Sequence, residues 1–455
     1  MLHYFCVKDK CFRVADTAAS LVRSQRKMKK IFRNVCDYSQ KYTGCTVAKT
    51  QKKRIAFLKV QNIFGGKSMK IAIMGFGTVG SGAYDVAMAA GGIEVVKILD
   101  LVVRKGYEDI ADRFTQDLTE ITGDPEIELV VEAMGGVDTP RKFVLECLKA
   151  GKSVVTPNKN LISACYGELM KTAKENGAEL RFTPAAGGGI PWLYSLLRTR
   201  RTDNIQEVRG IVNGTCNFIL DAMYDSGADF DEMLQTAKEL GYAEANPAAD
   251  IEGTDTLRKT VISSNLAFGT VIEEADVPCY GIDTITAADV AYLKEQGRVC
   301  KLMMNSRKEG DVITAYVEPV AFPATSLEAN VKTNNNLITL VGDKVGTLSF
   351  YGQGAGKMPT GESVIQDVLD IRDGRVLPIP PADAECRVDN DAAVHRYYIR
   401  HNRMCEHIEP IIDTYEEKDG IFYCISKPVS VTEMHKMGQH RKEKGKPMFF
   451  AALAE

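Results

Sequence analysis

The chain has 455 residues, of which 45% are hydrophobic and 26% are charged, as is typical of a water-soluble globular protein. No apolar run approaches the roughly 20 residues that a membrane-spanning helix needs, so we expect no membrane partner. A chain of this length can bury two or three separate hydrophobic cores.

The first 68 residues differ in charge from the rest. They carry 16 Lys and Arg against three Asp and no Glu, a net charge of +13, whereas the remainder carries −16. Such asymmetry occurs in arms that bind nucleic acid or membranes, and acid-poor basic leaders also direct proteins to organelles. We interpret residues 1–68 as an extension outside the folded protein, disordered or upstream of the true start, because a strand pattern begins directly after Met69. We expect no nucleic-acid partner, since the aromatic residues here form no stacking platform.

Short apolar runs alternate with helical segments between residues 69 and 178. The strand-sized runs are 70–74, 94–103, 127–133 and 153–156. The helical segments are 81–90, 140–150 and 161–176. Because parallel strands need crossover helices, this alternation predicts an α/β fold with a Rossmann-type, doubly wound parallel sheet, the dinucleotide-binding domain.

The pattern changes in residues 179–374. Strand patterns occur at 208–212, 313–319 and 345–350, and amphipathic helices are expected at 229–240, 256–268 and 362–369. We expect an α+β domain that binds the substrate. Pro378, Pro380 and Pro381 then predict a stiff linker. Residues 385–455 are expected to form a small third α+β domain, with strands at 396–400, 421–426 and 448–453.

A glycine-rich turn joins the first expected strand to the first expected helix. Its sequence is Gly75-Phe76-Gly77-Thr78-Val79-Gly80. The first glycine permits a tight turn, the second lets the backbone approach a pyrophosphate, and the third lets helix and strand pack closely. The N-terminus of the helix adds free N–H groups and partial positive charge. Between a strand and a helix this motif indicates a dinucleotide site, with a plain glycine turn as the alternative.

Two residues bear on the choice of cofactor. Asp100 lies 25 residues after Gly75, near the place where an acid binds a ribose 2′-hydroxyl, although it equally suits an internal strand end. Arg104 lies just beyond and is placed to accept a 2′-phosphate. The sequence therefore leaves NAD and NADP open, and Arg104 inclines the expectation to NADP.

A lysine and an aspartate are expected on one face at the beginning of the helix 256–268. Asp255 and Lys259 are four residues apart, and the preceding loop carries Glu244 and Asp250. The alternative is a solvated ion pair, the usual fate of this spacing. However, a lysine at the mouth of an apolar helix can also protonate the oxygen that forms when hydride reaches an aldehyde.

Two loops follow expected strands. Thr156-Pro157-Asn158-Lys159 lies at the carboxyl end of a strand, the edge that carries the ligand crevice in open α/β sheets. There Lys159 can meet cofactor and substrate, or it is a turn lysine with a free head group. Gly187-Gly188-Gly189 can ligate a hard cation through carbonyl oxygens or allow close backbone approach.

Taken in order, these motifs resemble those of homoserine dehydrogenase over residues 69–371. The likeness rests on Gly75 to Gly82, Val131 to Gly136, Thr156 to Lys159, Gly187 to Pro191, Asn213 to Leu220, Gly241 to Lys259 and Gly354 to Thr360. The resemblance implies a reversible conversion of L-homoserine and NAD(P) into L-aspartate 4-semialdehyde and NAD(P)H, in the aspartate-derived route to threonine and methionine. It also implies a small amino-acid substrate and a homodimer or homotetramer, with dimerisation through residues 179–374. The 12 cysteines form no C-x-x-C pair, so we expect reduced thiols and a cytoplasmic location.

The resemblance assigns roles to individual residues. Lys259 matches the proton-donating lysine, and Lys159 matches a second active-site lysine that approaches the nicotinamide. Glu244 and Asp255 match the acids that bind the substrate's amino group and hydroxyl end, and Asp250 is expected beside them. The further cofactor contacts that we expect are Thr78, Val79, Ala133, Met134, Pro157 and Gly356.

Two positions depart from the family pattern. Thr183 replaces a glutamate that helps to hold a monovalent cation, Na⁺ or K⁺, which leaves the carbonyls of Ala186, Gly188 and Ile190 as ligands. Cys216 replaces a hydroxyl residue and is expected to weaken a hydrogen bond near the substrate. These departures motivate the alternative of a non-catalytic relative that binds NAD(P) or an amino acid.

The C-terminal residues occupy the place of the ACT regulatory domain that many members carry. Tyr397-Tyr398-Ile399-Arg400 resembles the first strand of such a domain. The resemblance thus implies an ACT-like character for residues 385–455.

Overall fold

A computed structural model describes residues 6–7, 10–11, 68–380, 384–403, 406, 408–446 and 448–455. The chain divides into two compact units, Met1–Lys67 and Ser68–Glu455. In the first unit, the short strands β1 (Cys6–Val7) and β2 (Lys10–Cys11) pair antiparallel. The rest of the extension, and so the prediction made for it, lies outside the described residues. All further elements belong to the second unit.

The second unit begins with a six-stranded parallel sheet in the order β5-β4-β3-β6-β7-β8. Its strands are β3 (Met69–Met74), β4 (Ile93–Leu99), β5 (Phe114–Thr115), β6 (Leu129–Glu132), β7 (Ser153–Val155) and β8 (Leu180–Arg181). In chain order this is 3-2-1-4-5-6, the doubly wound topology with a switch point between β3 and β6. The predicted fold class is confirmed.

Helices cover both faces of this sheet. They include α3 (Thr78–Ala90), α4 (Thr119–Thr122), α5 (Asp138–Lys149) and α6 (Lys159–Glu175), with the 3₁₀ turn η1 (Glu108–Arg113). Alternate residues of β3 enter different cores: Ile71 and Ile73 join one cluster, whereas Ala72 and Met74 join the other. Burial on both faces explains why the strands are short continuous apolar runs.

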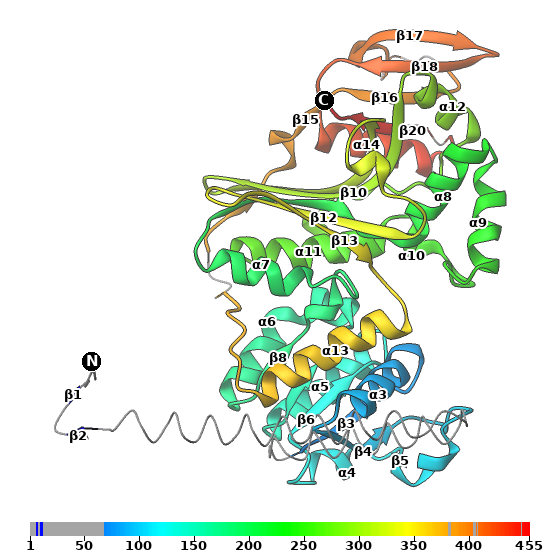
Figure 1. Cartoon of the computed structure of the whole chain (residues 1–455). Coiled ribbons are helices and arrows are strands. Elements are labelled where there is room, and N and C mark those ends of the chain that lie inside the picture. The colour runs from blue at the N-terminus through cyan, green and yellow to red at the C-terminus, as the bar shows by residue number, and fades with distance from the viewer. Residues whose placement is uncertain are drawn as a thin grey trace, which may run out of the picture. The chain divides into compact units, whose positions relative to one another are not determined.

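A late helix returns to the first sheet. Helix α13 (Lys357–Arg372) packs against α3, and Figure 1 shows the two side by side. Glycines permit this approach: a Cβ on Gly361 would lie 2.6 Å from the carbonyl carbon of Gly82. The sheet itself runs to Arg181, three residues beyond the boundary expected at residue 178, because β8 pairs with β7. Residues from both sides of that boundary therefore complete one layer.

The second sheet contains ten strands in the order β13-β12-β9-β10-β11-β20-β16-β18-β17, with β14 paired to β11 off this path. They are β9 (Ile205–Ile211), β10 (Arg298–Glu309), β11 (Val312–Pro323), β12 (Asn335–Gly342), β13 (Gly346–Gln353), β14 (Arg387–Val388), β16 (Tyr397–His401), β17 (Ile412–Lys418), β18 (Ile421–Ser426) and β20 (Phe449–Leu453). Strand β20 runs parallel to β11, pairing Val320 with Ala452. The C-terminal strands therefore continue the sheet of the preceding region (Figure 1).

Seven helices accompany this sheet in the described part of the chain. They are α7 (Trp192–Arg200), α8 (Gly214–Ser226), α9 (Phe230–Glu239), α10 (Ala248–Ile251), α11 (Thr254–Phe268), α12 (Ala287–Glu295) and α14 (Val431–Glu443). The shorter elements are η2 (Thr183–Ala185), η3 (Glu274–Asp276), η4 (Glu328–Asn330), η5 (Asn390–Ala392), η6 (Glu409–Ile411) and the pair β15 (Val394–His395) and β19 (Val429–Ser430). Helix α11 is the most deeply placed, because it contacts α6 of the first sheet as well as β9, β10 and β11. None of the described helices is long and apolar enough to cross a bilayer.

Candidate active site

A cleft of about 780 Å³ lies where the carboxyl ends of β3, β6 and β7 meet the beginning of α11. Of the residues predicted from the sequence, those that line it are Gly77, Thr78, Val79, Ala133, Met134, Pro157, Lys159, Gly188, Glu244, Asp250, Asp255, Lys259 and Gly356. The predicted residues that do not line it are Gly75, Phe76, Gly80, Arg104, Ala186 and Ile190. Residues from both domains therefore share one cleft at the sheet edge that binds ligands in this topology.

The glycine turn has the geometry of a dinucleotide cradle. Gly75 has φ +86°, and a Cβ there would lie 2.7 Å from the carbonyl carbon of Ala133. A Cβ on Gly80 would lie 1.9 Å from the carbonyl oxygen of Gly75, so helix and strand touch through bare backbone. At Gly77, by contrast, a Cβ would meet no atom within 4 Å. This open space beside the N-terminus of α3 is the place where a pyrophosphate fits.

Asp100 belongs to this turn through its carboxylate. Oδ2 accepts a hydrogen bond from the Phe76 backbone N–H at 2.5 Å, and Oδ1 accepts one from the Leu101 N–H at 2.7 Å. Strand β4 ends at Leu99, so the expected strand 94–103 was too long. The reason is that the Asp100 carboxylate binds the N–H groups that a ladder would otherwise use.

A buried glutamate that sequence reasoning missed organises the cofactor side of the cleft. Glu132, at the end of β6, is fully buried and accepts hydrogen bonds from Thr156 Oγ1 at 2.5 Å and the Met134 N–H at 2.7 Å. Asn158 Nδ2 donates a weaker third bond at 3.4 Å. Burial raises the pKa of Glu132. The carboxylate ties the loop after β6 to the loop after β7.

Asn158 then places the first predicted lysine. Its side-chain oxygen accepts the Leu161 N–H at 3.2 Å and caps α6, which makes Lys159 the first residue of the helix. The Val131 to Gly136 motif was one of those that carry the family resemblance, but only the folded loops reveal which groups its glutamate binds.

Both predicted lysines converge on one carboxylate. Lys259 Nζ lies 2.7 Å from Asp255 Oδ2, and Lys159 Nζ lies 2.9 Å from Asp255 Oδ1. Lys259 is 8% exposed and Asp255 is 6% exposed, so the alternative of a solvated ion pair does not describe this cluster. Lys259 also donates to the Val212 carbonyl at 2.6 Å.

The charges of the cluster support one another. Burial opposes ionisation of Asp255, but the two ammonium groups outweigh it and hold the pKa of Asp255 below its usual range. Asp255 in turn raises the pKa of Lys159. An ionised carboxylate between two ammonium groups leaves one net positive charge at the floor of the cleft, which suits an oxygen that gains negative charge.

Asn213 orients the acids and was not singled out from the sequence. Its Nδ2 donates to Asp250 Oδ1 at 2.7 Å and to Asp255 Oδ2 at 2.9 Å. Its Oδ1 accepts the Cys216 N–H at 2.8 Å and caps α8. Burial raises the pKa of Asp250. One amide, fixed by a helix end, thus positions two carboxylates of the cleft.

Cys216 does not line the cleft, so the expected weakening of a hydrogen bond near the substrate is not what the structure shows. Its buried thiol donates to the Asp250 carbonyl at 3.1 Å, and burial raises its pKa well above the usual value. The neighbouring Thr215 hydroxyl donates to the Tyr242 carbonyl at 2.6 Å and tethers the loop that carries Glu244. Glu244 itself is exposed at the cleft mouth.

The triple-glycine loop packs closely on another backbone. A Cβ on Gly188 would lie 2.3 Å from the Gly354 carbonyl oxygen, and the Gly189 N–H donates to the Gln353 carbonyl at 3.2 Å. The Ile190 carbonyl accepts the Trp192 N–H at 2.7 Å. These contacts favour the interpretation that the glycines allow backbone approach.

Thr183 binds a carboxylate on α13. Its Oγ1 donates to Asp367 Oδ1 at 2.9 Å, and its backbone N–H donates to Oδ2 at 3.0 Å. Burial raises the pKa of Asp367 to about 7. The described residues contain no group of three or more His, Cys, Asp or Glu side chains able to hold a metal ion.

The family models for "Homoserine dehydrogenase, NAD binding domain" and "Homoserine dehydrogenase" match residues 75–183 and 191–369. The chain belongs to the homoserine dehydrogenase family. The homoserine dehydrogenase of Corynebacterium glutamicum is 40% identical over 319 residues, which cover 67% of this chain and 72% of that protein. The enzyme of Bacillus subtilis is 34% identical over 67% of this chain and 73% of its own length.

Solved structures agree. The homoserine dehydrogenase of Thiobacillus denitrificans has a TM-score of 0.75 at 31% identity, covering 86% of this chain and 99% of that one. A hyperthermophilic archaeal homoserine dehydrogenase in complex with NADPH has a TM-score of 0.58 at 25% identity, covering 66% of this chain and 97% of that one. The likenesses confirm the predicted family and its class, an oxidoreductase with an NAD-binding domain. They do not support the alternative of a non-catalytic relative.

Proposed function

We propose that the chain interconverts L-homoserine and L-aspartate 4-semialdehyde with NAD(P), in the aspartate-derived route to threonine and methionine. The observation that carries this proposal is the cluster of Lys259, Lys159 and Asp255, which lies in the same cleft as the glycine turn. A dinucleotide on the turn and a small amino acid on the cluster then share one enclosed space.

The nicotinamide, when bound, supplies or accepts the hydride. Lys259 handles the proton: Asp255 and the Val212 carbonyl take two of the three N–H bonds of its ammonium group. The third N–H is available to the substrate oxygen, to which it donates a proton as the aldehyde is reduced. In the oxidative direction Lys259 takes the hydroxyl proton back.

We assign distinct roles to the acids. Both carboxylate oxygens of Asp255 already contact lysines, so Asp255 acts by positioning Lys259 and Lys159. Asp250 and Glu244 line the same cleft, and no ion pair involves either within the described residues. We therefore propose that these two carboxylates bind the ammonium group of the amino acid.

The cofactor is held on the glycine turn. The N–H groups at the start of α3, at Thr78 and Val79, face the pyrophosphate, and the loops at Ala133, Pro157 and Gly356 complete the walls. Asp100 is fixed against the turn by the Phe76 N–H, and its carboxylate suits a ribose hydroxyl while repelling a 2′-phosphate. We propose NAD as the preferred cofactor, in place of the NADP that Arg104 favoured.

The donor set for a monovalent cation does not fit well. The Thr183 hydroxyl binds Asp367, and the Ile190 carbonyl already accepts a hydrogen bond from Trp192. A carbonyl oxygen keeps a second lone pair when it accepts one hydrogen bond, so the carbonyls of Ala186, Gly188 and Ile190 are the predicted ligands that are left. All three are neutral, and no step of the mechanism is assigned to Na⁺ or K⁺.

Several expectations stay predictions. They are assembly as a homodimer or homotetramer, a cytoplasmic location, the domain division at residues 178 and 374, and an ACT-like character for residues 385–455. Their support is the family resemblance, together with the scattered cysteines for the location and the change of sequence pattern for the domain division.

The proposed activity is tested by following absorbance at the reduced-nicotinamide band with the full chain, L-homoserine and either cofactor. We expect saturable turnover. A folded protein that binds cofactor but shows no turnover with L-homoserine or with the semialdehyde would contradict the proposal.

A further inference from the structure

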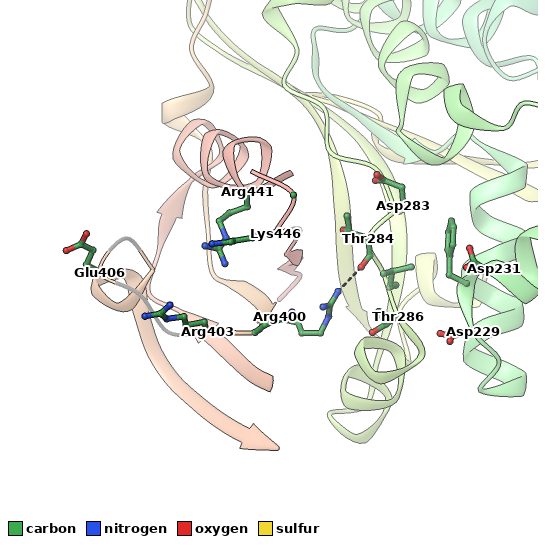
Figure 2. A pocket seen from close by; sticks show the side chains of 14 residues that line it. Asp229, Asp231, Asp283, Thr284, Thr286, Arg400, Arg403, Glu406, Arg441 and Lys446 are labelled. Atoms are coloured by element: carbon green, nitrogen blue, oxygen red, sulfur yellow. Dashed lines mark hydrogen bonds between the residues drawn. The ribbon is translucent and has the colours of Figure 1, made fainter. Parts of the chain in front are cut away.

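A second cavity, of about 1050 Å³, lies apart from the active-site cleft and is lined by an entirely different set of residues. One side is formed by the end of β16 and the end of α14, and the other by residues 283–286 and the start of α9 (Figure 2). The cavity therefore lies where the C-terminal strands meet the catalytic region.

Arg400 fixes the geometry of this junction. It is 8% exposed, and its Nε donates to both carboxylate oxygens of Asp289 at 2.8 and 2.9 Å. Its Nη2 donates to the Thr284 carbonyl at 2.7 Å, the bond drawn in Figure 2. Tyr398 also donates to Asp289, at 2.8 Å. Because its charge is matched by Asp289, Arg400 is a structural link and leaves the ligand chemistry to its neighbours.

Three other cations line the cavity without an acidic partner among the described residues. They are Arg403, Arg441 and Lys446. Lys442, on the same helix as Arg441, shows the contrast, since it pairs with Asp283 at 2.7 Å. In Figure 2 the side chains of Arg441 and Lys446 both extend from the end of α14 toward the segment that carries Arg400 and Arg403. Like charges gathered in this way repel unless an anion lies among them.

One guanidinium atom marks the place of a missing acceptor. Arg441 Nε is buried and has no hydrogen-bond partner in the described part of the chain. A buried charged donor without an acceptor is costly, so native structures satisfy such groups with protein, water or an ion. None of the described residues supplies an acceptor here, whereas an oxyanion would accept from this N–H and neutralise the charge.

The local potential agrees with this interpretation. His401, next to Arg400 in β16, is fully buried and accepts the Arg403 N–H on Nδ1 at 3.2 Å. Burial, together with the charges of Arg441 and Arg400, lowers the pKa of His401 to about 4. Four acids also line the cavity. Asp283 is paired with Lys442, and Asp229 and Asp231 lie on the opposite wall in Figure 2. Glu406 lies at the left of that view, on the side of Arg403, and forms no ion pair with a described residue, so the acids are not paired with the three cations.

We propose that this cavity binds a small doubly charged oxyanion, such as a phosphate group or a dicarboxylate, between Arg403, Arg441 and Lys446. The site is separate from the cleft that holds cofactor and substrate. A bound anion would link the end of α14 to the end of β16 and so stabilise the junction of the C-terminal strands with the catalytic region.

The test is calorimetric titration of the full chain with inorganic phosphate and, separately, with malonate, at constant ionic strength. We expect saturable binding of one anion, weakened at least tenfold in Lys446→Gln and in Arg441→Gln. Lys444→Gln is the matched control, because this exposed lysine lies at the same helix end and does not line the cavity. It should bind as the unchanged protein does. The anion that binds more tightly shows whether the site prefers a phosphate group or a dicarboxylate.

Two outcomes would overturn the proposal: no saturable binding of either anion, or equal weakening in Lys444→Gln and Lys446→Gln, which indicates general charge attraction. Phosphate bound at the glycine turn is recognised because it survives all three substitutions and is displaced by NAD, an outcome that also overturns the assignment to this cavity. Dehydrogenase activity, measured in parallel, shows that each variant is folded, and Lys446→Gln keeps the test decisive if Arg441→Gln fails to fold.

Discussion

Lys259 Nζ lies 2.7 Å from Asp255 Oδ2, and both side chains are almost wholly buried at the start of α11. The pair is therefore unlike the exposed ion pairs that helix spacing usually produces. The second oxygen of Asp255 binds Lys159, which comes from a different domain, so one carboxylate couples the catalytic helix to the cofactor-binding sheet.

Replacing Asp255 with Asn tests this coupling. Asp255 is the largest cause that raises the pKa of Lys159, and burial opposes it. Without the carboxylate, burial dominates and Lys159 loses its proton at lower pH. We expect kcat to fall about 100-fold, because misplaced catalytic groups cost rates of that order, and the alkaline limb of the rate profile to move to lower pH. An unchanged alkaline limb would show that Asp255 does not act through Lys159.

Replacing Glu132 with Gln separates positioning from stability. Burial raises the pKa of Glu132, so the folded protein is stabilised by this group below its ordinary pKa and loses that contribution as the pH rises through the raised value. A neutral Gln should therefore leave Tm at pH 8 unchanged or higher. The loops that Glu132 holds should become less fixed. The KM for the cofactor should therefore rise about tenfold, which corresponds to the loss of one charge-assisted hydrogen bond. Glu94→Gln, on an exposed position of β4, is the control. A lower Tm with normal cofactor KM would leave Glu132 a purely structural role.

Replacing Asp100 with Ser tests the choice of cofactor. The carboxylate stands at the glycine turn, 2.5 Å from the Phe76 N–H, where it favours a ribose diol. The unchanged chain should have the higher kcat/KM with NAD, and the variant should shift the ratio toward NADP by about tenfold, the effect of removing one repulsion of about 1.4 kcal/mol. Steady-state kinetics with both cofactors decides, and a preference of the unchanged chain for NADP would contradict the assignment.

Asp367 makes stability depend on pH. Its pKa is raised from 3.8 to about 7 by burial, so the folded state holds a proton that the unfolded state has released. Stability contributed by this group is complete below pH 3.8 and is lost as the pH rises to about 7, by roughly 4 kcal/mol at 1.36 kcal/mol per pKa unit. Asp367→Asn can keep both bonds to Thr183 and should lose this dependence. Denaturation at pH 5.5 and 8.5 measures the part of this loss that falls above pH 5.5, about 2 kcal/mol for 1.5 units at 1.36 kcal/mol each. Parallel losses in both proteins would refute the assignment.

The strands and helices around the cofactor were predictable because their physics is local. Buried parallel strands are continuous apolar runs, and β3, β6 and β7 were recognised on that basis. Strand β10 was missed, since Lys301 interrupts its apolar pattern. In the fold this lysine is buried and donates to Asn217 Oδ1 and the Val331 carbonyl, both at 2.8 Å.

What the sequence could not reveal depends on distant partners. Thr183 was interpreted as the loss of a cation ligand, yet it binds Asp367, 184 residues away. Asn213 lay inside a recognised motif. Its hydrogen bonds to two carboxylates, however, form only because the fold brings the start of α8 close to the start of α11. Local patterns thus located the chemistry, whereas the groups that hold it in place required the tertiary structure.

The most direct test of the account is the substitution of Lys259 by Ala, with turnover and cofactor affinity measured on the same sample. Since a positioned general acid contributes about 10²- to 10⁴-fold, we expect kcat to fall by about 10³-fold while the Kd for NADH, read from the fluorescence of its reduced nicotinamide, stays within about twofold. Lys238→Ala, at a half-buried position of α9 that does not line the cleft, should leave both values unchanged. Retention of full activity by the Lys259→Ala protein would contradict the central claim that this ammonium group delivers the proton.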